Sequence, residues 1–335
     1  MTHSALESRL SILAMPVPEA TDAGRPHLVR GLTLLAAVAV VVGDTIGTGV
    51  FLVSSDMARV AGSAPRVLAA WVIGGFIVLF GAFCYAELGA AFPKAGGPYV
   101  YLSRGIGPLW GFLFGWMSSF LERPVAMATL AAGIVRFLSF LWPPIAHPWF
   151  TGHVGTYRFT FTTAQPLAAV VVVIATALNY FSVRLSGAIQ VLLTLLKVAA
   201  ILVIVVAGAA VASRINSAAM PVVPALFSFA SFTALLTALV PAMWAYNGFN
   251  DLGDLGEEII DPQKNIPRAI ILGLAIIAGL YLMANVTYFH VLPFTSVAAS
   301  EHVASDVVQS FWGPRGAQWL TLAMAMSALG ALHVV

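Results

Sequence analysis

The chain has 335 residues, of which 60% are hydrophobic and 9% charged, with a mean hydropathy of +0.92 and a formal net charge of +2 at pH 7. This composition excludes an ordinary soluble domain and predicts a polytopic, all-α membrane protein. The small net charge leaves no basic surface for nucleic acid. The single cysteine, Cys84, lies in an apolar run and provides neither a disulfide nor a cysteine metal site.

The first 28 residues are polar and contain several prolines and arginines, without the pattern of a secretory signal peptide. We expect residues 1–28 to form a disordered cytoplasmic tail and residues 29–335 to form one transmembrane permease domain. Apolar segments predict about eight helices in this domain, the eighth cut short. The segments cover residues 31–53, 67–92, 107–142, 166–181, 187–212, 226–259, 269–292 and 318–335.

Lys and Arg in the short loops are slightly more numerous on the side of the membrane where the N-terminus lies. By the positive-inside rule this excess predicts a multi-pass protein of the cell membrane with a cytoplasmic N-terminus. Arg268, directly at the mouth of a predicted helix, supports the same orientation.

The first apolar segment is interrupted in its own middle. Gly43, Gly47 and Gly49, with Thr45 and Thr48 between them, form a poor continuous helix. Backbone freed at such a point is tolerated in lipid only where it is buried in protein or lines a cavity. The stretch therefore predicts a substrate site made of backbone near the membrane midplane. The alternative is a close-packing face of small residues.

The sixth apolar segment has the same irregularity. It is too long for one straight span, and its polar cluster, residues 247–251, lies in the middle and is followed by Gly253 and Gly256. Two interrupted helices in the first and sixth positions predict a transporter built from two inverted five-helix repeats, with its site where the breaks meet.

The start of a half-helix offers free N–H groups and a positive dipole end, which suit a carboxylate, and Gly47, Thr48 and Gly49 are placed to donate to one. Carbonyl groups at the end of the preceding half-helix suit an ammonium, and Thr45 and Ile46 occupy that end. These opposed backbone charges predict a zwitterionic α-amino acid as the ligand.

Two charged residues fall near the midplane and need partners there. Asp44 is predicted either to take part in proton transfer or contact the unwound backbone, or to cap the broken helix. Lys197 lies about ten residues into the fifth span, too deep to reach the headgroups comfortably, and requires carbonyls or a carboxylate within the bundle. For Glu122 and Arg123, which adjoin in the third span, we expect a structural role.

Several motifs carry a family resemblance when taken together in this order. They are GDTIGTGVF (43–51), YAELGAAFPKAGGPYVYLSRGIGPLWGFLFGW (85–116), ERPVA (122–126), QVLLTLLK (190–197) and WAYNGFNDLGDLGEEIIDPQKNIPRAI (244–270). From about residue 28 to its end the chain resembles the amino acid, polyamine and organocation permeases, most closely their L-type amino acid transporter branch. The resemblance implies the LeuT-like inverted five-plus-five repeat, here with an incomplete second repeat.

The resemblance also assigns roles on the sixth segment. It implies that carbonyls of Trp244, Ala245 and Asn247 help to bind the ammonium, that Trp244 closes over the substrate, and that Tyr246 and Gly248 belong to the same site. Lys197 resembles the family's lysine that stands where sodium-coupled relatives hold an ion, which implies sodium-independent transport. Asp251 departs from the pattern, because the L-type branch often carries an aromatic residue there.

The expected function is sodium-independent transport of amino acids, by exchange or by proton coupling. The alternatives are a polyamine or other organic cation permease and, in a different class, a channel or an inactive fragment. No nucleophile or metal cluster indicates an enzyme, no cofactor is expected, and no charge ring or filter indicates a channel. Expected partners are the amino acid and the lipid bilayer. Residues 142–165 contain no cysteine for the disulfide-linked heavy chain of heteromeric members, so we expect none.

Overall fold

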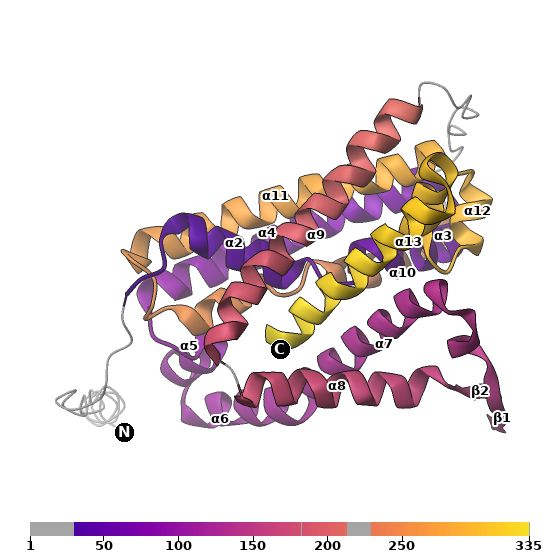
Figure 1. The fold of residues 1–335 in the computed structure, drawn as a ribbon. Helices are drawn as coiled ribbons and strands as arrows, with labels where there is room; N and C mark the ends of the chain where they lie inside the picture. The colour runs from indigo at the N-terminus through magenta and orange to yellow at the C-terminus, as the bar shows by residue number, and fades with distance from the viewer. Residues whose placement is uncertain (1–29, 182, 213–228, 335) are drawn as a thin grey trace, which may run out of the picture.

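The computed structural model describes residues 30–181, 183–212 and 229–334, and the tail expected at 1–28 lies outside them. These residues fold into long helices packed side by side, with one small β-hairpin among them (Figure 1). The elements are α2 (Leu34–Thr45), α3 (Gly49–Ala61), α4 (Ala64–Ala91), α5 (Gly97–Gly105), α6 (Pro108–Met117), the π-helix η1 (Ser118–Glu122), α7 (Arg123–Leu141), the 3-10 helix η2 (Pro143–Ala146), β1 (Pro148–Val154), β2 (Tyr157–Thr162), α8 (Ala164–Phe181), α9 (Val183–Ala212), α10 (Phe229–Ala245), the 3-10 helix η3 (Phe249–Leu255), α11 (Pro262–Val291), α12 (Phe294–Ala299) and α13 (Val303–Val334).

Within the described residues, each of the eight predicted apolar segments forms helix, with breaks in the first and sixth segments. By length and composition, four helices of the described part can cross a membrane alone, namely Ala64–Ala91, Pro108–Leu141, Leu192–Val211 and Pro262–Val291, and the bent pair of α2 and α3 makes a fifth. Of the rest, α8 and α10 are shorter, with 18 and 17 residues. The last segment begins earlier than predicted, at Val303, and bends at Gly313, where φ is +70°.

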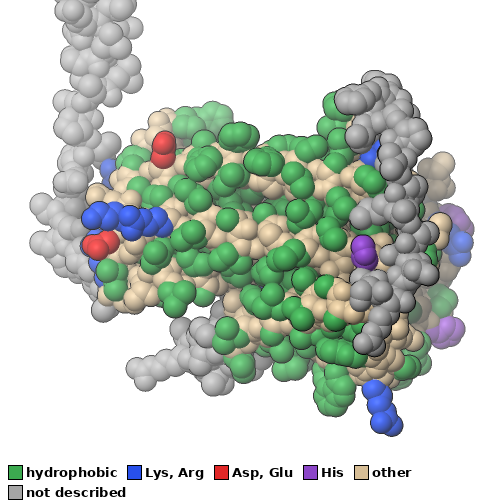
Figure 2. Space-filling view, turned by 90° about the horizontal axis from the view of Figure 1, so that it is seen from above, with side chains coloured by type: hydrophobic (Ala, Val, Ile, Leu, Met, Phe, Trp, Pro, Cys, Tyr) green, Lys and Arg blue, Asp and Glu red, His purple; other side chains and the backbone are tan. Residues whose placement is uncertain are grey.

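The surface agrees with a membrane setting. Figure 2 shows a face covered mainly by hydrophobic side chains, with charged side chains and histidines near the two ends of the helices. An uncharged belt between charged ends is the arrangement that a hydrocarbon layer about 30 Å thick requires.

The third span changes its winding at its middle. The N–H of Arg123 donates to the carbonyl of Ser118, five residues earlier, so one turn is wider than an α-helical turn. Pro124 follows directly and has no N–H to donate to Phe120, which removes one α-helical bond at this point. Such π-bulges frequently occur at functional sites.

The core lies around α11, which packs against α4, α2 and α9, while α10 packs against α3 and α4. Trp71, Tyr281 and Tyr288 are among its largest fully buried side chains. The start of the first span is fixed to the end of the sixth, because the N–H groups of Gly31 and Leu32 both donate to the carbonyl of Glu258 at 2.9 Å.

Candidate functional site

The first break lies between α2 and α3. After Thr45, Ile46 leaves the helical conformation with φ −76° and ψ 90°, and the N–H of Gly47 donates to the carbonyl of Thr45 at 2.9 Å. These values describe a tight three-residue turn. The two half-helices are bent by 43°. The predicted interruption is therefore confirmed.

The start of α3 is left with free donors. Phe51 donates to the carbonyl of Thr48 at 3.3 Å, whereas the N–H groups of Thr48, Gly49 and Val50 have no backbone acceptor in the described part of the chain. The 13-residue helix α3 directs its positive dipole end to the same place. Free amides and a helix N-terminus together favour an anion.

The second break lies between α10 and η3, as the sequence predicts. The N–H of Asn247 donates to the carbonyl of Trp244 at 3.1 Å, and Gly248 follows with φ +122°, a conformation that favours glycine. Beyond it the chain continues as the 3-10 helix η3 rather than as an α-helix.

The two breaks meet backbone to backbone. A Cβ built on Gly248 would lie 3.0 Å from the carbonyl carbon and oxygen of Asp44 and from Cα of Thr45. A Cβ built on Gly49 would lie 2.7 Å from Cβ of Ala245. Both glycines are therefore required by the close approach of the first and sixth spans.

Tyr281 contacts the backbone at both breaks. The hydroxyl of Tyr281 on α11 lies 3.1 Å from the carbonyl oxygens of Thr45 and Ala245, the last residues of α2 and α10. A phenol has one hydrogen, so Tyr281 donates to one carbonyl at a time or shares its hydrogen between them. Because the side chain is fully buried, this contact fixes the spacing of the two helix ends.

A cavity of about 100 Å³ opens where the breaks meet. Most of the predicted site residues line it: Asp44, Thr45, Gly47, Thr48, Gly49, Trp244, Ala245, Asn247 and Gly248. Thr45 is almost fully buried, and its hydroxyl oxygen has no hydrogen-bond partner among the described residues. This hydroxyl can donate a hydrogen bond to, or accept one from, a group that enters the cavity.

The other three predicted residues lie outside the cavity lining. Ile46 is fully buried in the apolar core. Tyr246 points the other way, where its hydroxyl donates to the carbonyl of Trp71 at 3.2 Å. Lys197 is fully buried on α9 and donates from Nζ to the carbonyl of Gly43 at 2.7 Å, within electrostatic reach of Asp44.

The structure adds four polar or charged residues to the candidate site, of which Glu122 and Arg123 were expected to have only a structural role. Glu122, Arg123, Asn250 and Asp251 line the central cavity and also a second cavity of about 220 Å³. The second cavity is bounded further by residues at the start of α5 and by the end of α6 and η1. The four residues thus separate two neighbouring cavities. We call these four residues the layer between the cavities. The sequence signal for it was a Glu-Arg pair in an apolar span, directly before a proline.

Ion pairs hold the layer together. The guanidinium of Arg123 lies 3.2 Å from a carboxylate oxygen of Asp254 and 3.7 Å from one of Asp251. All three side chains are part-exposed, so each pair contributes modestly to stability. The described residues contain no group of three or more His, Cys, Asp or Glu side chains that could hold a metal ion.

Comparison with known proteins identifies the family. A family model described as "Amino acid permease" matches residues 32–335. The chain belongs to the amino acid permease family. Relatives include the human large neutral amino acids transporter small subunit 2, which is 30% identical over 94% of this chain and 57% of its own length. The human cystine/glutamate transporter is 32% identical over 92% and 59%. The mouse Asc-type amino acid transporter 1 is 29% identical over 92% and 56%.

Membership in this family confirms the resemblance to the L-type branch and the polytopic helical membrane fold. The chain spans 56% to 59% of the length of these curated relatives.

Proposed function

We propose that this permease is a secondary transporter that binds the α-carboxylate and α-ammonium of an amino acid at the two breaks. Transport is independent of sodium and proceeds by exchange or by proton coupling. The protein lies in the cell membrane with its N-terminus in the cytoplasm. The observation that carries the proposal is the cavity between the breaks, which has free amides on one side and helix-end carbonyls on the other. The relatives named above are amino acid transporters, which supports this class of substrate.

The carboxylate end of the site is the start of α3. The amides of Thr48 and Gly49 are free to donate, and the unpartnered hydroxyl of Thr45 adjoins them. Trp244 lies over this point, since a Cβ on Gly49 would be 3.6 Å from its ring. A bound carboxylate beneath the ring would be shielded from water, which strengthens its hydrogen bonds.

The ammonium end is the carbonyl end of α10. A carbonyl oxygen has two lone pairs. The oxygen of Thr45 already accepts from the N–H of Gly47, and the oxygens of Thr45 and Ala245 share the single hydroxyl hydrogen of Tyr281. Ala245 therefore has more capacity than Thr45 to accept from an ammonium.

Sodium independence rests on Lys197. Its ammonium is held against the carbonyl of Gly43, two residues before the end of α2, and so supplies a fixed positive charge behind the first break. A second cation at this place would be repelled, and the lysine performs the structural work that a bound ion would otherwise do.

Transport by purified protein in proteoliposomes tests the proposal. Each of the standard amino acids, radiolabelled, is offered with sodium or choline outside, with or without internal substrate, and with or without a proton gradient. We expect the rate of uptake to be independent of sodium and to increase with internal substrate or with an inward proton gradient. Strict sodium dependence would refute the role of Lys197, and uptake of polyamines without amino acids would favour the alternative substrate class.

A matched pair of variants locates the site. Gly49→Leu places a side chain between α3 and Ala245 and should abolish binding in an inserted protein, whereas Gly81→Leu on α4 meets open space and should bind normally. Binding that survives in a well-folded Gly49→Leu protein would remove the site from the first break.

A further inference from the structure

The hairpin of β1 and β2 has one aromatic face. Strand pairing sets Gly152 opposite Phe159 and Phe150 opposite Phe161, so these residues share a face of the two-stranded sheet. An irregularity in the register just before Phe150 adds Trp149 to the same group. The rings of Trp149 and Phe161 and those of Phe150 and Phe159 both lie with centroids 5.9 Å apart.

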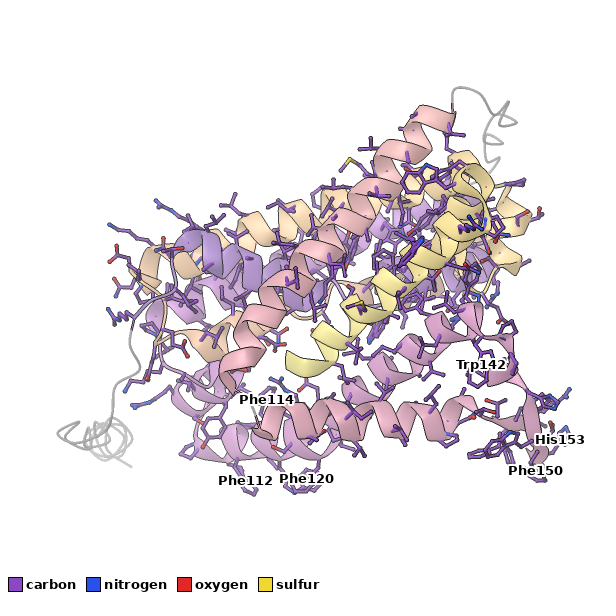
Figure 3. The ribbon with its side chains drawn as sticks, viewed as in Figure 1. Phe112, Phe114, Phe120, Trp142, Phe150 and His153 are labelled. Atoms are coloured by element: carbon purple, nitrogen blue, oxygen red, sulfur yellow. The ribbon has the colours of Figure 1, made fainter. Side chains whose placement is uncertain are left out.

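The opposite face is polar and basic. Alternation along the strands places Thr151, His153, Arg158 and Thr160 there. Figure 3 shows Phe150 and His153 at the outer end of the hairpin, away from the helix bundle. The hairpin is thus amphipathic, with one aromatic face and one polar, basic face.

The aromatic face has no cover from the described part of the chain. Trp149, Phe150, Phe159 and Phe161 are 42% to 62% exposed, although large apolar side chains in water are unfavourable. The hairpin joins the end of α7 to the start of α8, and in Figure 1 it runs sideways past α8, away from α4 and α11. The hairpin thus lies at the ends of two apolar helices, and we expect this level to be close to the membrane–water interface.

The charge of the segment restricts what can cover it. Residues 142–165 include His147, His153 and Arg158 and contain no Asp or Glu. Aromatic side chains with an apolar body prefer the membrane–water interface, and basic residues there favour anionic lipid headgroups. A lipid surface satisfies both features.

We propose that the hairpin 148–162 is an interfacial anchor, whose aromatic face enters the boundary between headgroups and acyl chains beside α8 and whose basic residues lie among anionic phosphates. The anchor fixes the ends of α7 and α8 relative to the membrane plane. It does not depend on the nature of the transported substrate.

Neighbouring single-cysteine positions test the anchor. In a Cys84→Ser background, Phe161→Cys and Thr160→Cys are each labelled with an environment-sensitive fluorophore, and the protein is reconstituted in phosphatidylcholine vesicles containing phosphatidylglycerol. Doxyl-labelled lipid should quench the probe at position 161 about threefold more than the probe at 160, and aqueous iodide should do the reverse. Both positions lie on the same strand, so a folding defect would affect them alike.

Three results would overturn the proposal. The first is equal iodide quenching at both positions. The second is protection of position 161 from both quenchers, which would indicate a protein on this face. The third is doxyl-lipid quenching at position 161 that is the same with and without phosphatidylglycerol. Arg158→Gln should remove the dependence on the anionic lipid.

The unlabelled protein gives an independent measurement. Trp149→Phe keeps an aromatic ring but removes the emission of Trp149. The difference between the emission of the parent protein and that of the variant is the Trp149 component, and brominated lipid should strongly quench this component. A Trp149 component that brominated lipid leaves unquenched would also overturn the anchor.

Discussion

Tyr281→Phe removes one hydroxyl from a fully buried ring and leaves the shape of the core unchanged. The oxygen lost lies 3.1 Å from the carbonyls that end α2 and α10. Hydrogen bonds between membrane helices contribute about 0.6 kcal/mol on average and at most about 1.7 kcal/mol. The variant should therefore unfold more easily by an amount in this range.

The same free energy should appear in substrate affinity. If Tyr281 holds the two breaks in the binding-competent geometry, its loss reduces the population of that geometry, and the apparent affinity falls by the same factor. A loss of 0.6 to 1.7 kcal/mol corresponds to at most about a 3- to 20-fold weaker affinity, a limit reached when the binding-competent geometry is the minor state. Tyr281 acts as a positioning residue, since it does not line the cavity.

Tyr288→Phe is the matched control. Tyr288 lies on the same helix, is equally buried, and donates its hydroxyl to the carbonyl of Val50 at 3.2 Å, within α3 rather than at the end of a half-helix before a break. Two quantities are measured for both variants. They are thermal unfolding and equilibrium binding of a labelled amino acid, the one that the wild-type protein takes up best. We expect similar losses of stability but weaker binding for Tyr281→Phe alone. Equal affinities in the two variants would refute the reasoning.

Three further substitutions give distinct outcomes. Lys197→Ala should leave an inserted protein whose initial uptake rate is at least about tenfold lower, because a fully buried ammonium behind the first break is lost; wild-type uptake by this variant would contradict the role. Gly248→Ala introduces a Cβ at φ +122° against the backbone of α2 and should destabilise the protein by roughly 1–3 kcal/mol in thermal unfolding, while Gly279→Ala, which meets open space, should not. Arg123→Gln leaves Asp254 without its cation and should reduce transport several-fold, with partial rescue by Arg123→Lys; an unchanged rate in the Gln variant would show that the layer between the cavities does not need the charge.

Features that depend on a few neighbouring residues were predictable. The lengths of the apolar runs locate the helices, because a span must satisfy its own backbone in lipid. The glycines at 43, 47 and 49 and the polar residues at 247–251 locate the two breaks, because helix propensity is a local property. The structure confirms both breaks, with α2 ending at Thr45 and α10 at Ala245.

The orientation of side chains at the breaks was less predictable. Ile46 and Tyr246 lie within the predicted stretches, but the turn after α2 buries Ile46 in the core, and Trp71 draws the hydroxyl of Tyr246 away from the cavity. Sequence position identifies the break, whereas the packing of α4 and α11 decides which side chains face the cavity.

What the sequence by itself determined about this protein is its membrane character, its helices, the two breaks and its family. Only the tertiary structure placed Arg123 against Asp254, 131 residues away, and Tyr281 against both helix ends. It also turned a loop without predicted structure into a hairpin with one aromatic face. The physical reason is range: helix formation and its interruption are decided within a few residues, whereas ion pairs, buried hydroxyls and strand register depend on which distant surfaces the packed bundle brings into contact.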